Sequence, residues 1–353
     1  IQRQKDIKIV YTPIHGTGAK LVPMALESFG FENIYTVDEQ MVADGNFPTV
    51  ISPNPEESAA LEMALNLADS INADLVMATD PDSDRVGIAI RKEGKLVLLN
   101  GNQAATLLIY YLLEKWRENE KLTGNEYIVK TIVTSEILFD IANKYKVAHY
   151  DVLTGFKYIA DIIKDLEGVK TFIGGGEESY GYLVGDFVRD KDAVSSCAML
   201  AEVAAWAADK GFGLFDLLRN IYHEFGFYKE DLVSVVRKGK AGAEEIQKMM
   251  DDFRNNPPKS LNGSKLIRIK DYLTSVETDL NKGEEIQINL PKSNVLQFFT
   301  EEGSKVSVRP SGTEPKIKFY FGVKAPLDDV ASFEKVNLML EQRIEKIKKD
   351  LGI

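Results

Sequence analysis

Short apolar runs rich in β-branched residues alternate with stretches of helical periodicity over the first two-thirds of the chain. This alternation predicts βαβ units, in which consecutive strands pair mostly in parallel and helices cover both faces of the sheet. The expected fold class of this region is therefore α/β. The predicted strands cover residues 7–11, 33–37, 74–79, 86–90, 127–133, 148–153 and 169–173.

Two turn signals divide the α/β region near residue 97. A Glu-Gly-Lys turn covers residues 93–95, and an Asn-Gly pair follows at residues 100–101. Pairs of this kind are typical of turns and connections. Beyond them the order of strands and helices starts again. We therefore predict two related domains, residues 1–96 and 97–225, each with a mostly parallel mixed sheet.

The order of elements changes after residue 225. A helix is predicted at about residues 242–255 and a long charged helix at residues 328–350. Between these helices strand follows strand, which predicts a smaller α+β domain with an antiparallel sheet over residues 226–353. Its predicted strands cover residues 266–269, 286–290, 295–300, 305–308 and 317–323.

Charge and composition limit the partners of this chain. A net charge of −11 would repel polyanions such as nucleic acids and anionic membranes. The longest apolar run, residues 107–113, is far shorter than the ~20 residues that span a bilayer. A single cysteine, Cys197, excludes an internal disulfide and fits a reducing compartment. We expect a soluble, cytoplasmic protein with a small-molecule ligand. Because the chain opens at Ile1 almost directly in a predicted strand, we also expect a fragment of a longer protein.

Three carboxylates alternate in a short loop between two predicted strands. Asp80, Asp82 and Asp84 would repel one another without a cation, and Mg²⁺ prefers such oxygen ligands. An EF-hand is excluded, because Arg85 and Arg91 occupy the positions of its glycine and its bidentate glutamate. The alternative is a solvated acidic turn. The guanidinium of Arg85 next to the carboxylates favours a site that holds a phosphate against a metal.

A second candidate site is the turn RPSGTEP at residues 309–315. Arg309 offers a charged fork, Ser311 and Thr313 offer hydroxyls, and Gly312 lets backbone N–H groups approach an oxyanion. The turn is typical of a phosphate-binding loop. Pro and Gly fit an ordinary β-turn equally well, so the motif by itself leaves both interpretations open.

A third candidate site is the glycine-rich run GGGEESYG at residues 174–181, which follows a predicted strand. Open parallel sheets bind ligands at the carboxyl ends of their strands. Glu177 can accept hydrogen bonds, and Ser179 can both accept and donate them, which suits neighbouring sugar hydroxyls. Lys157, in TGFK at residues 154–157, also follows a strand, and its amine could transfer a proton or bind phosphate. A glycine-rich loop with incidental acids is the alternative.

A different function class is suggested by the run HGTGAK at residues 15–20. It follows a predicted strand and opens a helix, and Asp38 lies at a suitable distance for a dinucleotide-binding oxidoreductase. Leu21 occupies the position of the third glycine, where helix packing requires Gly or Ala. The fingerprint is therefore incomplete.

The motifs, taken together and in order, resemble those of the α-D-phosphohexomutases, the phosphoglucomutase and phosphomannomutase family. The resemblance covers essentially the whole chain. It rests on DPDSDR at residues 80–85, TGFK at 154–157, GEESYG at 176–181, GDFVRDKD at 185–192 and RPSGTEP at 309–315.

The resemblance implies roles for the candidate residues. Asp80, Asp82 and Asp84 would hold Mg²⁺, with Arg85 beside the phosphoryl group and Lys157 as a general acid or base. Glu177 and Ser179 would bind the sugar hydroxyls. The non-reacting phosphate would be bound by Arg309, Ser311, Gly312 and Thr313.

The resemblance also implies an activity and a departure from the family. The expected reaction interconverts hexose 1-phosphate and hexose 6-phosphate through a hexose 1,6-bisphosphate, which is both intermediate and activator. The family's catalytic loop, a serine followed by histidine, asparagine and proline, does not occur in this sequence. The chain would correspond to domains two to four and would lack normal turnover by itself. The form GEESYG favours glucose phosphates. A noncatalytic sugar-phosphate-binding protein is a further alternative.

Overall fold

The computed structural model describes residues 1–237, 239–312 and 314–353. The contacts within the chain divide it into two compact units, Ile1–Ile221 and Tyr222–Ile353. Within the described residues, no helix is both long enough and apolar enough to cross a membrane.

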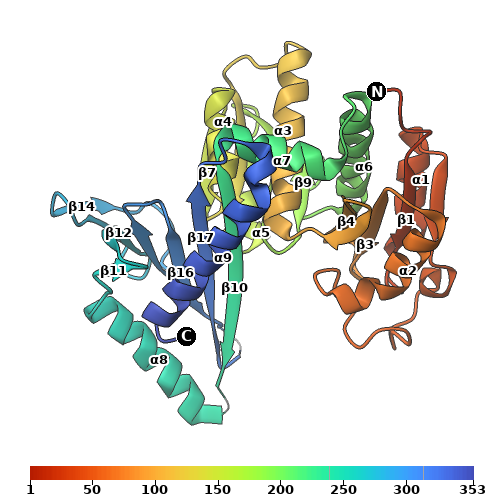
Figure 1. Cartoon of the computed structure of the whole chain (residues 1–353). Helices are drawn as coiled ribbons and strands as arrows, with labels where there is room; N and C mark the ends of the chain where they lie inside the picture. Colours follow the sequence, from red (N-terminus) through yellow and green to blue (C-terminus); the bar gives the residue numbers. More distant parts are fainter. Residues whose placement is uncertain (238, 313) are drawn as a thin grey trace. The chain divides into compact units, whose positions relative to one another are not determined.

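The first unit contains a five-stranded sheet in the order β2-β1-β3-β4-β5, of which Figure 1 labels β1, β3 and β4. Strand β1 pairs in parallel with β2 and β3, whereas β4 and β5 continue the sheet with antiparallel pairs. The strands are β1 (Lys8–Thr12), β2 (Asn33–Thr36), β3 (Leu75–Thr79), β4 (Val86–Lys92) and β5 (Lys95–Leu98).

Helices bury both faces of this sheet. Helix α2 (Glu62–Ile71) presents Ala64 and Ala68 to a fully buried cluster that includes Val10 and Val76. Because side chains alternate along a strand, the neighbouring residues of β1 and β3 point to the opposite face. On that face lie α1 (Gly18–Ser28) and α6 (Ala193–Asp209), which pack against each other.

A second sheet in the same unit has four strands in the order β7-β6-β8-β9. Strand β6 pairs in parallel with β7 and β8, and β9 is antiparallel to β8. Helix α5 buries its apolar stripe on one face, through Ile159 and Ile163. The elements are α3 (Gly101–Glu118), β6 (Glu126–Thr131), α4 (Ile137–Lys144), β7 (Ala148–Val152), α5 (Phe156–Asp165), β8 (Thr171–Gly176) and β9 (Tyr182–Val184). The division between the two units falls within α7 (Leu214–Phe225).

The Asn-Gly pair between the two sheets begins a helix. The Asn100 side chain accepts from the Gln103 backbone N–H, and the Gln103 side chain accepts from the Asn100 N–H, which forms a capping box. Gly101 lies so close to the next sheet that an added Cβ would be 1.9 Å from the Glu178 carbonyl oxygen. The domain boundary predicted near residue 97 stays a prediction, and β5 runs across it.

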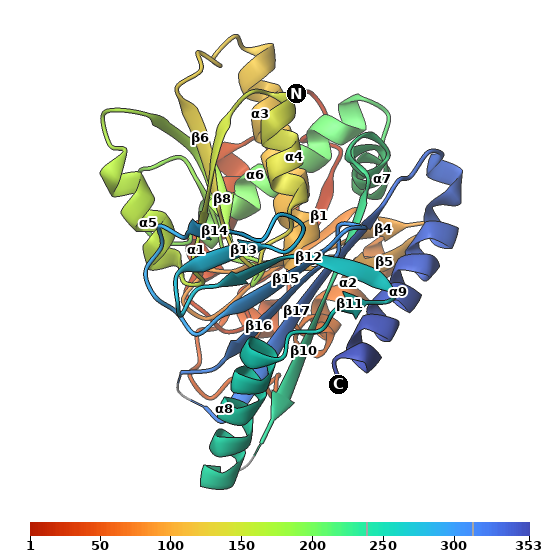
Figure 2. The same ribbon diagram turned by 90° about the vertical axis from the view of Figure 1, so that its left-hand side faces the viewer.

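The second unit is built around an antiparallel sheet in the order β10-β17-β16-β15-β12-β13-β14, with β11 beside β12 (Figure 2). Phe319 and Phe321 share one face of β17. Helix α8 packs on this face through Phe253, whose ring centroid is 6.1 Å from that of Phe319. The elements are β10 (Phe227–Val236), α8 (Gly239–Asn255), β11 (Ser260–Leu261), β12 (Ser264–Asp271), β13 (Val276–Asp279), β14 (Glu284–Gln287), β15 (Leu296–Thr300), β16 (Lys305–Pro310), β17 (Lys316–Ala325) and α9 (Phe333–Asp350).

The predicted fold class is confirmed. Mixed sheets with parallel and antiparallel pairs form the first unit, and an antiparallel sheet forms the second. The prediction missed the strands β5, β9, β10, β11 and β13. The side chains of β10 and β13 are mostly half-buried or exposed along the strand. It also missed three short 3-10 helices, at Asp38–Met41, Ser58–Leu61 and Val330–Ser332.

Candidate functional site

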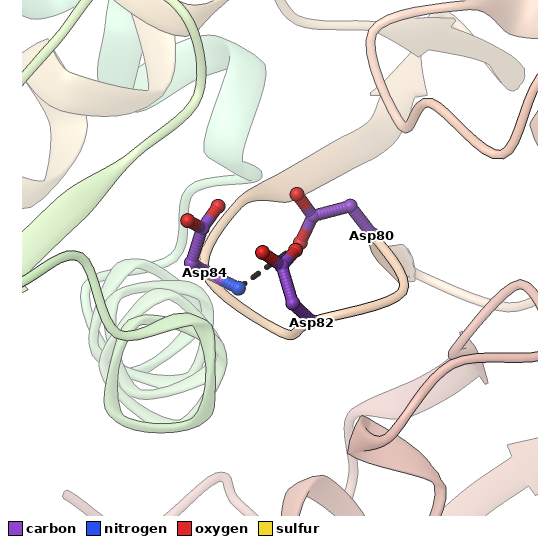
Figure 3. Close-up of side chains that lie close together, drawn as sticks. All are labelled: Asp80, Asp82 and Asp84. Atoms are coloured by element: carbon purple, nitrogen blue, oxygen red, sulfur yellow. Dashed lines mark hydrogen bonds between the residues drawn. The ribbon is translucent and has the colours of Figure 1, made fainter.

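The acidic loop lies at the carboxyl end of β3, where the chain turns back into β4. Asp80 is buried, with 8% of its surface exposed, whereas Asp84 is half-buried and Asp82 is exposed. One carboxylate oxygen from each residue lies within 4.8 Å of the others (Figure 3). The structure therefore brings together the three ligands that the sequence predicts.

Backbone geometry holds the loop in this shape. Oδ1 of Asp80 accepts hydrogen bonds from the N–H groups of Asp84 at 3.0 Å and of Arg85 at 2.9 Å. Ser83 adopts the left-handed conformation with a φ of 59°, and its N–H donates to the Asp80 carbonyl at 3.0 Å. Asp80 thus organises the turn with one oxygen and leaves the other for a ligand.

The electrostatics of the loop favour a cation. Burial, together with the charges of Asp84 and Asp82, raises the pKa of Asp80 to about 7, although the Arg85 N–H opposes the shift. A hard divalent ion would remove this penalty by pairing with the carboxylates. The donor set consists of oxygens only, so these residues fit Mg²⁺.

Arg85 lies beside the carboxylates, as the sequence predicts. Its Nε is 3.7 Å from Asp84 Oδ1 and 3.9 Å from Asp80 Oδ2. The other end of the guanidinium donates to Glu56 Oε1 at 3.2 Å. The Arg85 charge is therefore held next to the acidic loop by partners on two sides.

Lys191 is a neighbour of the loop to which the sequence analysis gave no role. Its Nζ is 2.9 Å from Asp84 Oδ2 and 2.9 Å from Asp190 Oδ1. Burial by itself lowers the pKa of Lys191, but its two carboxylate partners outweigh that effect, so the pKa is raised. The DKD run at residues 190–192 was the signal that could have identified this cation.

The glycines of residues 15–20 pack against the acidic loop. The Thr17 N–H donates to the Pro81 carbonyl at 2.8 Å, and a Cβ on Gly16 would lie 2.5 Å from Pro81 Cα. Close backbone approach here serves the fold of the candidate metal site. A bound dinucleotide would need close approach to Gly16 and a free N–H donor in this turn. Both Gly16 and the Thr17 N–H are instead in contact with Pro81.

Substituting Gly16→Ala is therefore expected to weaken Mg²⁺ binding about tenfold, a loss typical of a disturbed outer shell of a metal site. Calorimetric titration of the chain with Mg²⁺ measures the effect. Gly45→Ala is the matched control, because nothing lies within 4 Å of a Cβ at Gly45. Equal Mg²⁺ affinities of the two variants would contradict the prediction.

The GEESYG run forms the turn between β8 and β9, against the acidic loop. The Val86 N–H donates to the Tyr180 carbonyl at 3.0 Å, and Arg85 forms an isolated antiparallel bridge with Gly181. Two motifs that are far apart in the sequence are therefore joined by backbone pairing.

Within this turn, Glu177 is buried and accepts the Gly155 N–H at 2.8 Å. Burial and the nearby Glu178 raise the pKa of Glu177. Glu178 itself accepts from Thr131 Oγ1 at 3.1 Å and from Thr134 Oγ1 at 3.3 Å. Glu178 and these two threonines, to which the sequence analysis gave no role, anchor the turn.

The remaining predicted residues of this region are more accessible. Ser179 is half-buried. Lys157 is exposed in the first turn of α5, with Nζ 4.9 Å from the centroid of the Tyr158 ring. Gly155, two residues before Lys157, donates its N–H to Glu177.

The RPSGTEP turn joins β16 to β17 in the second unit. Arg309 and Ser311 are half-buried and Gly312 is exposed, while Thr313 lies outside the described residues. The Ser311 N–H donates to the Lys316 carbonyl at 2.8 Å. Arg309, Ser311 and Gly312 line a pocket of about 390 Å³ together with Gln247 of α8, Ser293 and Asn294.

Known proteins resemble this chain along most of its length. Residues 1–94, 100–225 and 232–337 match the family descriptions "Phosphoglucomutase/phosphomannomutase, alpha/beta/alpha domain II", "alpha/beta/alpha domain III" and "C-terminal domain". A phosphoglucomutase of Staphylococcus aureus strain USA300 is 40% identical over 339 residues, which cover 96% of this chain and 60% of that protein. The chain thus spans about three-fifths of the relatives that it matches.

Solved structures share the fold at low sequence identity. A putative phosphomannomutase from Thermus thermophilus has a TM-score of 0.63 at 18% identity, over 95% of this chain and 61% of that one. Parafusin, a phosphoglucomutase from Paramecium, has a TM-score of 0.62 at 17% identity, over 99% of this chain and 59% of that one. On the family matches and the 40% identical relative, this chain belongs to the phosphoglucomutase/phosphomannomutase family.

Proposed function

We propose that this chain forms the metal, sugar and phosphate sites of an enzyme that interconverts glucose 1-phosphate and glucose 6-phosphate. The reaction passes through glucose 1,6-bisphosphate and a phosphoserine that is not among these residues. In this proposal residues 1–96 carry the metal loop, residues 97–225 the sugar loop and residues 226–353 the phosphate loop.

The observation that carries the proposal is the joining of the acidic loop to the GEESYG turn. Asp80, Asp82 and Asp84 form a cluster of carboxylate oxygens, and the bridge between Arg85 and Gly181 joins the GEESYG turn to this loop. A metal site next to a sugar-reading turn suits a phosphorylated sugar. The 40% identity to a phosphoglucomutase supports glucose phosphates as the substrates.

Transfer of a phosphoryl group depends mainly on positioning and on stabilising negative charge. Mg²⁺ held by the three aspartates would supply neutralisation of charge on the transferred group. Arg85 and Lys191 are both paired to Asp84 and would bind phosphoryl oxygens at the same place. These cations are held by the fold before a substrate arrives, which lowers the cost of reorganisation.

The sugar is bound by its hydroxyls and the proton is taken by a nearby base. Glu177 and Ser179 would hydrogen-bond adjacent hydroxyls. The phosphorus–oxygen bond to the serine breaks while a bond from phosphorus to the 6-hydroxyl oxygen forms. The neutral amine of Lys157 would accept the hydroxyl proton and pass it to the departing serine oxygen. Return of the 1-phosphoryl group to the serine, with the reverse proton transfer, then gives glucose 6-phosphate.

The proposal is tested in a coupled assay that follows glucose 6-phosphate formation from glucose 1-phosphate, with Mg²⁺ and catalytic glucose 1,6-bisphosphate. Turnover is expected from a protein that joins this chain to a serine-bearing catalytic domain, and none from the 353 residues alone. Sugar-phosphate binding without turnover in the joined protein would favour the noncatalytic alternative. Calorimetric binding of NAD would favour the oxidoreductase, against which the packing of Gly16 on Pro81 argues.

Arg309→Met is expected to weaken glucose 1-phosphate binding about tenfold, because a charge-assisted fork to the phosphate is lost. Calorimetry on the chain measures the dissociation constant. Arg268→Met removes an equal charge in the same unit from a side chain that stacks on Phe299 and does not line the pocket. A parental affinity in Arg309→Met would show that this turn does not bind the phosphate.

A further inference from the structure

The pocket of the RPSGTEP turn has a second wall, formed by residues outside that motif. Gln247 of α8 and the adjacent Ser293 and Asn294 line the pocket together with Arg309. We propose that Asn294 donates a hydrogen bond to the phosphate bound in this pocket, and that Arg254 orients Asn294 for this role. The inference rests on the proposed function, because it takes the pocket as a phosphomonoester site.

The orientation of the Asn294 amide follows from its partner. Its Oδ1 accepts from Arg254 Nη2 at 2.8 Å. A guanidinium only donates, so the oxygen of the amide must face it and the NH₂ group must face away. Among the described residues, that NH₂ group donates to no protein atom. Because Asn294 lines the pocket, its two N–H donors are available to an anion there.

Arg254 is itself fixed by an ion pair. Its Nε donates to Asp271 Oδ2 at 3.0 Å, and only 17% and 12% of the two side chains are exposed. Asp271 also accepts the Leu273 N–H at 3.0 Å through Oδ1. The guanidinium is therefore held on two sides by groups that cannot easily rotate, so Arg254 presents Asn294 in one orientation.

The polar groups of the pocket suit a phosphate dianion. Arg309 supplies charge, and Asn294 supplies neutral donors that add hydrogen bonds without a further charge. Glu314 also lines the pocket, but its carboxylate is paired with Lys316. Gln247 donates its amide N–H to Asp251 Oδ1 at 3.0 Å, so its oxygen is left for a sugar hydroxyl.

The decisive variant is Asn294→Asp, titrated calorimetrically with inorganic phosphate. An aspartate still accepts from Arg254 but has no donor and repels the anion, so phosphate affinity is expected to fall at least about tenfold. Asn281→Asp is the matched control, because Asn281 accepts from Lys265 at 2.8 Å and does not line the pocket. Asn281→Asp should bind phosphate like the parent chain. Equal affinities of the two variants, or no phosphate binding by the parent chain, overturn the inference.

The positioning role of Arg254 is tested by a double-mutant cycle. Arg254→Lys keeps the charge opposite Asp271 but has no second N–H fork for Asn294, and should weaken phosphate binding severalfold. In an Asn294→Ala background the same change should have no further effect. Additive losses would show that Arg254 only supports the fold, and would overturn this part of the inference.

Failure of this inference is distinguishable from failure of the proposed function. Phosphate binding that depends on Asn294, in a protein that forms no glucose 6-phosphate in the coupled assay, would uphold the inference and reject the mutase. Turnover together with phosphate binding that is indifferent to Asn294→Asp would do the reverse.

Discussion

Asp82→Asn is expected to weaken Mg²⁺ binding by roughly 100-fold, because the substitution removes a charged metal ligand. Loss of an outer-shell partner weakens metal binding by up to about this factor. Asp82 is the cleanest probe of the three carboxylates. Asp80 organises the loop through two backbone N–H groups, and Asp84 is paired with Lys191. Asp82 is exposed, and no hydrogen bond or ion pair joins it to the described residues.

The same substitution should not weaken the metal-free fold. It removes a negative charge that contributes to the raised pKa of Asp80, so the melting temperature in a chelator should be equal to or higher than that of the parent. In Mg²⁺ the order should reverse, because only the parent gains stability from the bound ion. Calorimetry and thermal melts with and without Mg²⁺ measure both effects.

The control for this experiment is Asp161→Asn. Asp161 is an exposed carboxylate on α5 and is not among the clustered acidic residues. Its replacement changes the net charge by the same amount. If Asp161→Asn lowers Mg²⁺ affinity as much as Asp82→Asn does, the effect is one of overall charge, and the acidic loop is not the metal site.

Removing both carboxylates that neutralise Lys130, in the double variant Asp151→Asn/Glu136→Gln, is expected to lower the free energy of unfolding by about 3–5 kcal/mol. Lys130 is fully buried in β6, and its Nζ is 2.6 Å from Asp151 and 3.1 Å from Glu136. The double variant leaves a buried ammonium with neutral partners only: the two new amide oxygens, the Thr131 carbonyl oxygen at 3.4 Å and the Phe139 ring at 4.1 Å. Urea unfolding at neutral pH measures the loss.

The stability of the parent chain and that of the double variant should depend on pH in opposite ways. In the parent, burial by itself lowers the pKa of Lys130, but Asp151 and Glu136 outweigh it and the pKa is raised. The contribution of Lys130 to stability is then constant through neutral pH and is lost only as pH rises above about 10.4, the ordinary lysine value. Without the carboxylates, burial alone acts and the folded pKa falls below that value. The double variant should therefore become more stable as pH rises toward about 10.4, because the unfolded state binds more protons in that window.

A single change supplies the comparison. Lys130→Met removes the buried charge and leaves carboxylates whose side chains are 29% and 36% exposed, so water can solvate them. Its loss of stability should be clearly smaller than that of the double variant. A double variant that is as stable as Lys130→Met, or whose stability does not rise with pH, would show that Lys130 is not an obligate member of a buried ion cluster.

Local features of the sequence were sufficient for several parts of the structure. Strands β1, β3 and β4 are apolar runs buried on both faces, so no knowledge of their neighbours was needed to predict them. Strand β10 was missed, because half-exposed positions make its sequence weakly apolar and its pairing with β17 defines it. The Asn-Gly pair at residues 100–101 caps helix α3, which the sequence alone did not predict, since a turn and a helix cap use the same residue types.

The acidic loop that suits Mg²⁺ was determined by the sequence alone, because Asp80, Asp82 and Asp84 lie within five residues and any turn there brings their oxygens together. The partners of that loop were decided only by the tertiary structure. Gly16 packs against Pro81, and Lys191 pairs with Asp84, although both come from distant segments of the chain. In the second unit, Arg254 likewise donates to the distant Asn294. Which residues become neighbours across such separations depends on how strands pair and helices pack, and that is a property of the whole unit.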